Sequence, residues 1–301
     1  MTETAQPPVQ PPAQPSAQPP ALDRLRRRFW AGAERGACRL FHAALALRAR
    51  DATAQAALRP ALVLAPHADD ESLGCGGIIA LKRAAGTRVE VLVATDGTAS
   101  HRAEPTRRTG PDALAALRRA ETQAACATLG LAPERLGFLG LPDGRLAEHE
   151  PRLAAAIRAR LAAARPDEVY VCALRDGHPD HAALARAART ALSGPAGQGI
   201  ALREYPVWSF DFRSWRRPGR NSTGFLLGLR DMARAAAGWR MAAVRLGPAR
   251  QVKAEALAQH RSQLGTYPAE PGWSGLPSHF LAHFAGRREL FRDVALPERR
   301  P

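Results

Sequence analysis

The sequence predicts an α/β fold with a doubly wound, mostly parallel sheet and helices on both faces. Two observations support this prediction. Short apolar runs of strand length alternate along the chain with longer helical segments, which is the order of βαβ units. Clusters of His and Asp directly follow two of these runs, at the strand ends where parallel sheets form their sites.

The predicted sheet begins at residues 61–66, an apolar run typical of a buried strand. A polar turn follows, and then a helix that extends to about Ala85. Residues 88–95 are rich in valine, which favours a second strand because β-branched side chains pack well on a pleated surface. Residues 111–129 have helical character, and Gly130 is the expected stop.

Further alternation completes the prediction of a Rossmann-like sheet. Strand, helix, strand, helix and a last strand are expected in turn at residues 136–139, 151–164, 167–173, 181–192 and 202–208. Beyond them the pattern predicts helices at 226–237 and 249–264, and an irregular cap over the remainder.

The N-terminal residues differ in composition from the rest. Residues 1–21 are mostly Pro, Gln, Ala and Ser, which cannot bury enough apolar surface to offset the entropy of ordering, so we expect a disordered tail. Residues 22–57 carry apolar side chains at the spacing of one helix face and predict an appended helical segment, in one helix or two. The α/β domain is then expected over residues 58–301.

The strong positive charge has two interpretations. The formal net charge is +15, and arginine supplies nearly all of it, since Lys82 and Lys253 are the only lysines. A basic surface attracts nucleic acids, anionic membranes or acidic substrates, whereas scattered arginines on helix surfaces need no partner. The scatter favours the second interpretation, so no nucleic-acid partner is expected. One cluster also suits a membrane surface or an acidic partner, although a solvated helix face is the simpler explanation: Arg24, Arg26, Arg27 and Arg28, followed by Phe29 and Trp30.

Targeting signals and cysteine chemistry are not visible, so the sequence predicts a cytoplasmic protein without a transmembrane segment. Apolar runs such as residues 61–66 are far too short to cross a bilayer, and the first 22 residues lack the apolar core of a secretory signal. None of the four cysteines stands in a CxxC pair, so each is interpreted as a small buried hydrophobic residue.

The first reactive cluster is the run PHADDE at residues 66–71, directly after the first predicted strand. It brings one imidazole and three carboxylates to a strand end. Zinc binds His nitrogen and carboxylate oxygen, and a catalytic zinc keeps one position open for water. A solvated acidic turn that caps the following helix explains the carboxylates equally well.

The second cluster, HPDH at residues 178–181, favours the metal interpretation. It lies just past the predicted strand at 167–173, in the equivalent place on a parallel sheet. Two separate His/Asp clusters at the ends of parallel strands indicate one shared pocket more strongly than a lone histidine does.

Together the clusters resemble the signatures of the PIG-L/LmbE-like family, metal-dependent enzymes that remove acetyl groups from N-acetylated amino sugars. The family's first signature usually reads AHPDDE, whereas here Pro66 precedes His67, and every chemical side chain of the motif is present. The second signature matches without change. The resemblance covers roughly residues 62–264.

The resemblance implies roles for six residues. The ligands of a zinc ion, or of another divalent metal, would be His67, Asp70 and His181. Asp69 would be the general base, and His178 would stabilise the oxyanion or protonate the leaving amine. Asp180 would orient its neighbours.

Contacts to the substrate follow less directly. Arg118 and Asp143 stand where the family holds the sugar, although a solvated helix face and a simple turn explain them equally well. Lys253 and His260 are seven residues apart, which would place them on one helix face, and we interpret them as packing. Asp176 stands where some relatives carry a tyrosine that assists the oxyanion.

The sequence therefore predicts a zinc-dependent hydrolase that removes an acetyl group from a small-molecule N-acetyl sugar conjugate. The alternatives are an amidase acting on another amide conjugate and a non-catalytic α/β binding module. No GxGxxG or P-loop pattern supports the binding module.

Overall fold

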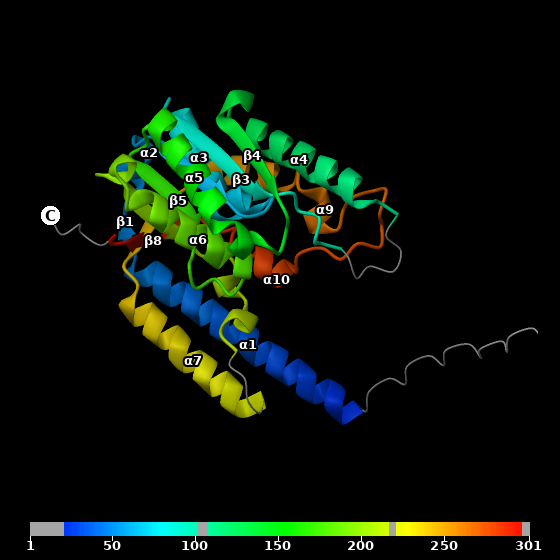
Figure 1. The fold of residues 1–301 in the computed structure, drawn as a ribbon. Helices are drawn as coiled ribbons and strands as arrows, with labels where there is room; N and C mark the ends of the chain where they lie inside the picture. Colours follow the sequence, from blue (N-terminus) through cyan, green and yellow to red (C-terminus); the bar gives the residue numbers. More distant parts are fainter. Residues whose placement is uncertain (1–20, 102–107, 217–220, 297–301) are drawn as a thin grey trace, which may run out of the picture.

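The computed structural model describes residues 21–101, 108–216 and 221–296 of the chain. One eight-stranded sheet forms its centre (Figure 1), in the order β1-β7-β8-β6-β5-β2-β3-β4. The strands are β1 (Arg50–Asp51), β2 (Ala61–Ala65), β3 (Val89–Thr95), β4 (Leu136–Leu141), β5 (Glu168–Cys172), β6 (Ala201–Tyr205), β7 (Met241–Arg245) and β8 (Arg288–Val294). The helices are α1 (Ala21–Arg48), α2 (Thr53–Ala57), α3 (Asp70–Ala84), α4 (Pro111–Thr128), α5 (Glu150–Ala164), α6 (Pro179–Leu192), α7 (Asn221–Gly238), α8 (Ala249–Leu257), α9 (Arg261–Leu264) and α10 (Ser278–Leu281).

The predicted fold class is confirmed. Every strand pairing among the described residues is parallel except those of β8, which runs antiparallel to β6 and β7. Helices α5 and α6 pack on each other, and α3 packs on α8, so the sheet carries helices on both faces. The central strands β2, β3 and β5 are buried along their whole length, as expected for a sheet covered on both sides.

The expectation that residues 202–208 form the last strand is wrong. Strand β6 ends at Tyr205, and β7 and β8 extend the sheet beyond it. Their sequences, MAAVR and RELFRDV, are rich in Ala or in charged residues. β8 does not resemble an apolar strand run, because four of its seven side chains are charged, and the short β7 gains its stability from its neighbours in the sheet. The cap that follows α8 is therefore less irregular than expected.

The predicted helix at 249–264 is broken, so the shared helix face of Lys253 and His260 is also wrong. Helix α8 ends at Leu257, and His260 has a non-helical backbone (ψ 58°) just before α9. The buried His260 ring lies 2.9 Å from the carboxylate of Glu71, and this tertiary contact replaces the helical continuation. Both residues are nevertheless buried, as the packing interpretation expects, and Lys253 donates to the carbonyl of Leu73.

Residues 21–48 form one continuous helix, and α1 packs beside α7 in a layer below the sheet in the view of Figure 1. The expected disordered tail spans residues 1–21, of which residues 1–20 lie outside the described part of the chain and Ala21 begins α1. Residues 50–51 pair with β7 at one edge of the sheet. The domain boundary at residue 57 stays a prediction. Among the described helices, none is long and apolar enough to cross a membrane.

The strand order places the two His/Asp clusters together. Strands β2 and β5 are hydrogen-bonded neighbours with Leu64 opposite Val171, and the chain leaves their carboxyl ends toward α3 and α6. The next strand along the chain, β3, lies on the other side of β2, so this is the point where the winding of the sheet reverses. Open α/β sheets bind ligands at such switch points.

Candidate active site

The loop after β2 is fixed from several sides. The carbonyl of Pro66 accepts hydrogen bonds from both the amide and the hydroxyl of Thr95. The Asp69 amide donates to Glu71, whose other carboxylate oxygen contacts His260. Asp69, Asp70 and Glu71 are all buried, so the interpretation of this run as a solvated acidic turn is wrong.

The backbone of Asp69 is strained. Its φ is 127°, in a region that residues other than glycine rarely occupy. Such a conformation costs about 1–3 kcal/mol and persists only where the surrounding structure enforces it, most often at functional sites. Here the strained turn directs the Asp69 carboxylate into the pocket that His67 and Asp70 also line.

Asp70 joins the two clusters. Its Oδ2 lies 3.2 Å from His67 Nδ1 and 3.3 Å from His181 Nε2. Ligand atoms of a tetrahedral zinc site, with bonds of about 2.0–2.1 Å, lie about 3.3 Å apart. Asp70 therefore lies at this spacing from each of the two imidazoles that the resemblance implies as metal ligands.

The ring of His181 is oriented by a carboxylate at its Nδ1 atom. Its Nδ1 lies 2.7 Å from Asp176 Oδ2, and Asp176 also accepts hydrogen bonds from the amides of Val207 and Ser209. A carboxylate at Nδ1 holds the proton there, as assigned from the hydrogen-bond network, and leaves the Nε2 lone pair for a cation. The buried Nε2 has no hydrogen-bond partner among the described residues.

The buried Asp70 carboxylate, between His67 and His181, requires a positive charge beside it. Burial raises the pKa of Asp70, but His181 and His67 outweigh it and hold that pKa well below its ordinary value. Burial lowers the pKa of His181, but Asp70 and Asp176 outweigh it and raise that pKa well above its ordinary value. Protons can supply this charge, and so can a divalent cation between the imidazoles and the carboxylate. The residues present therefore fit a metal ion.

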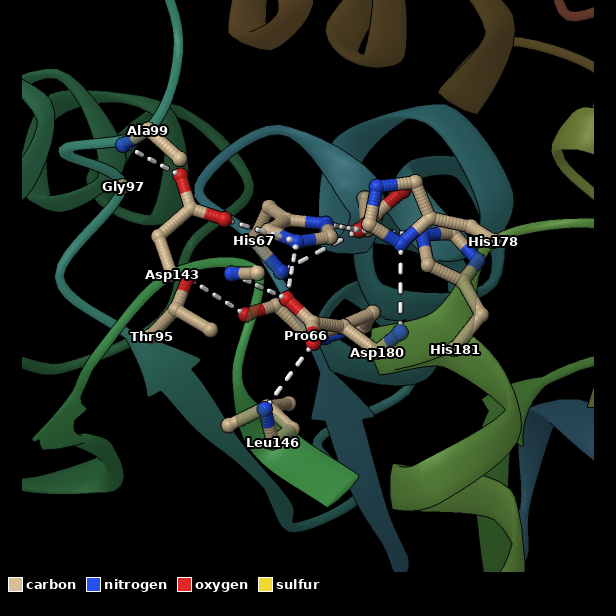
Figure 2. Close-up of polar contacts among 12 residues, drawn as sticks. Pro66, His67, Thr95, Gly97, Ala99, Asp143, Leu146, His178, Asp180 and His181 are labelled. Carbon is tan, nitrogen blue, oxygen red and sulfur yellow. Dashed lines mark hydrogen bonds and ion pairs between the residues drawn. The ribbon is translucent and has the colours of Figure 1, made fainter. Parts of the chain in front are cut away.

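The second nitrogen of His67 faces carboxylates (Figure 2). Its Nε2 lies 3.1 Å from Asp180 Oδ2 and 3.3 Å from Asp143 Oδ1. Asp180 also accepts hydrogen bonds from the amides of Gly144 and Leu146, so its own position is fixed. Asp180 thus lies where it can orient His67 and keep the Nδ1 lone pair directed toward Asp70.

His178 differs from the other two histidines. The three rings offer ligand atoms within 4.8 Å of one another. However, His178 Nδ1 accepts a hydrogen bond from the Asp180 amide at 3.2 Å, which places the proton of the neutral ring on Nε2. Burial, together with His67 and His181, lowers the pKa of His178 to about 4. A neutral ring with an Nε2 proton is a hydrogen-bond donor rather than a metal ligand.

Asp69 has the properties of a general base. Burial and the neighbouring charge of Asp70 raise its pKa to about 7. A carboxylate poised near neutral pH takes up and returns a proton efficiently.

The pocket has a volume of about 220 Å³. Arg118 lines it and is buried, with one guanidinium nitrogen donating to the carbonyl of Gly97, so the interpretation of Arg118 as a solvated helix face is wrong. Asp143 also lines the pocket and accepts from the Ala99 amide. Wall residues that the sequence did not indicate come from distant segments: Val207, Trp208 and Leu276. Trp208 stood at the end of a predicted strand, and its position there was the only available signal.

Part of the chain is similar to known deacetylases. Residues 62–192 match the family model described as PIG-L: GlcNAc-PI de-N-acetylase. Over 170 residues the chain is 35% identical to the 1D-myo-inositol 2-acetamido-2-deoxy-alpha-D-glucopyranoside deacetylase of Kineococcus radiotolerans, and the match covers 47% of this chain and 46% of that protein. The chain thus spans about half the length of this curated relative.

Solved structures support the fold. The conserved protein TT1542 from Thermus thermophilus superposes with a TM-score of 0.51 at 26% identity, covering 81% of this chain and 98% of that one. The N,N'-diacetylchitobiose deacetylase of Pyrococcus horikoshii gives a TM-score of 0.53 at 20% identity over 78% and 84% of the two chains. The zinc-inhibited form of teicoplanin deacetylase Orf2 gives 0.55 at 20% identity over 79% and 99%. At these identities the last two show the fold alone.

Proposed function

We propose, from the match of residues 62–192 to the PIG-L family model, that the protein is a hydrolase that removes the acetyl group from an N-acetylated amino sugar or its conjugate. The observation that carries the proposal is Asp70, whose one oxygen lies within 3.3 Å of both His67 and His181. A curated relative of this chain is named as a deacetylase of such a conjugate. The spacing supports a metal site, and the buried carboxylate beside it supports hydrolysis.

His67, Asp70 and His181 would hold a divalent metal, with zinc as the first candidate because it prefers histidine nitrogen and carboxylate oxygen in this arrangement. When bound, the ion would supply Lewis acidity toward the amide carbonyl and lower the pKa of water in the site. Asp176 and Asp180 would hold the two imidazoles in the tautomers that bind it.

Asp69 would accept the proton of the attacking water. Its pKa of about 7 leaves a substantial fraction ionised at neutral pH and still basic enough to take the proton. The same group, once protonated, is the natural donor to the leaving amine. This favours Asp69 over His178 for that second transfer, because the low pKa of His178 keeps its ring neutral.

His178 would donate its Nε2 proton to the oxygen that becomes negative as the amide carbonyl is attacked. The hydrogen bond from the Asp180 amide fixes the tautomer that makes this possible. Arg118 and Asp143, on the pocket wall, would bind sugar hydroxyl groups. Trp208 also lines the pocket wall, with its ring stacked on Phe280.

The test is amine release from a panel of N-acetylglucosamine conjugates and unrelated amides, after loading with zinc or iron. Asp69→Asn should lose at least 100-fold in kcat, whereas Asp112→Asn, an exposed acid at the start of α4, should keep full activity. Cleavage of only the unrelated amides would establish an amidase of different specificity. No cleavage of any amide by the loaded protein would contradict the proposal.

A further inference from the structure

Helix α1 has an apolar stripe on its outer face. Five large side chains are 66–88% exposed there: Leu22, Leu25, Phe29, Leu40 and Leu47. At about 100° per residue they fall within a sector of roughly 60°. The other side of the helix is already satisfied, because Cys38, Phe41 and Leu45 are buried in the core cluster. α1 therefore has two apolar faces, of which the described residues cover one.

A basic stripe runs beside the apolar one. Exposed arginines at i, i+4, i+11 and i+15 occupy the adjacent sector of the helix: Arg24, Arg28, Arg35 and Arg39. Among the α1 side chains that the structure describes, the one carboxylate is Glu34, which pairs with Arg216. The side chain of Arg27, named with this cluster from the sequence, lies outside the described residues. The exposed part of α1 thus combines apolar and cationic side chains, and Arg35 and Arg39 of the basic stripe also border the cavity between α1 and residues 210–213 and 277–283.

We propose that this outer face of α1 docks on an anionic lipid surface. A helix with one apolar and one basic stripe lies in the plane of the interface, with its apolar side chains at the boundary between headgroups and acyl chains. The flanking arginines then reach the lipid phosphates, where each basic residue gains from the negative surface potential. Phe29 and Leu25 stand at the N-terminal end of α1, which projects beyond α7 (Figure 1).

Charge decides between this occupant and others. A second copy of α1 would bring the same arginines and no described carboxylate from its outer face to meet them. The tail before α1 is a poor cover, because among residues 1–20 the only large apolar side chains are Met1 and Val9. A nucleic acid would pair with the arginines but leave five large apolar side chains in water. An anionic bilayer complements both stripes.

The experiment is co-sedimentation of the full chain with vesicles of phosphatidylcholine alone or with about a third phosphatidylglycerol. Binding should require the anionic lipid and weaken with salt. The double variant Arg28→Gln/Arg35→Gln should bind about thirtyfold more weakly, at about fivefold per arginine. Leu25→Gln/Phe29→Gln should lose at least tenfold.

Matched controls distinguish the effect of the two α1 stripes from the effect of net charge or of exposed apolar surface elsewhere. Arg152→Gln/Arg158→Gln removes the same charge from exposed sites on α5, and Leu58→Gln removes an exposed leucine outside α1. Both should bind like the wild type. All sites are exposed, so unchanged thermal unfolding is expected throughout.

Three results would overturn the proposal. One is no binding to anionic vesicles. Another is an equal loss in the α5 control, which would make the attraction one of net charge. The third is a dimer in lipid-free solution that Leu25→Gln/Phe29→Gln dissociates while vesicle binding is unchanged. The inference does not depend on the proposed hydrolysis.

Discussion

Replacing Asp176 by Asn tests how the candidate metal site is held. The carboxylate accepts from His181 Nδ1 at 2.7 Å through Oδ2, and from the Ser209 amide at 2.7 Å and the Val207 amide at 3.0 Å through Oδ1. Asparagine has nearly the same shape, but one of its two ends can only donate. The Ser209 hydroxyl also donates to Oδ1, at 2.8 Å, so no orientation of the amide can satisfy all four donors.

Each orientation of the substituted side-chain amide has a definite cost. If its NH₂ group faces His181, the imidazole must accept at Nδ1, and the proton moves to Nε2, where it blocks the metal. If the NH₂ group takes the place of Oδ1, the buried Ser209 amide is left without an acceptor, at about 1–3 kcal/mol, while the Val207 amide keeps the oxygen at the Oδ2 position, 3.1 Å away. Loss of such a supporting carboxylate typically weakens metal binding 10–100-fold, or about 1.4–2.7 kcal/mol.

The assay is zinc titration against a competing chelator, with thermal unfolding of the metal-free protein measured in parallel. Asp176→Asn should bind metal 10–100-fold more weakly, unfold earlier, or both. Asp211→Asn is the matched control, because Asp211 lies in the same region but pairs with Arg213. Unchanged metal affinity together with unchanged stability would refute the proposed orientation of His181.

Two further predictions concern stability. Gly74→Ala should destabilise the protein by about 1–3 kcal/mol, because the added Cβ would lie 2.2 Å from the Tyr205 ring. Gly36→Ala, with open space around the added Cβ, should instead stabilise α1 by about 0.5–1 kcal/mol. Chemical denaturation that ranks the two variants alike would contradict both expectations. For pH, burial raises the pKa of Glu168, but Lys82 and its neighbours outweigh it and lower that pKa from 4.5. The contribution of Glu168 to the free energy of unfolding is therefore present above about pH 4.5 and is lost as the pH falls through the depressed pKa. Glu168→Gln should flatten the acid limb of the plot of stability against pH. An unchanged acid limb would rule this contribution out.

The sequence was informative where the signal is local. The alternation of apolar runs and helical segments predicts the central strands and their helices, because burial on both faces makes β2 wholly apolar and leaves β3 and β5 mostly apolar, with one glutamate each. The two His/Asp clusters lie directly after β2 and β5, and parallel pairing of neighbouring strands places them together.

The remainder depends on tertiary contacts. Strand β8 carries charged side chains on both of its sides and exists through its pairing with β6 and β7. The helix break at His260 follows from its contact with Glu71, far away in the sequence. Trp208 and Leu276 line the pocket from separate segments, and no spacing in the sequence predicts that they lie close together. The function of Asp176 depends on the direction of one imidazole, which the residue order does not determine.

The most direct test of the central claim is metal content by elemental analysis, measured with amine release, for the wild type, Asp70→Ala and Asp69→Ala. We expect one divalent ion per chain in the wild type, loss of both metal and activity in Asp70→Ala, and retained metal with lost activity in Asp69→Ala. A wild-type protein that binds no metal after reconstitution, or an Asp69→Ala variant that remains fully active, would contradict it.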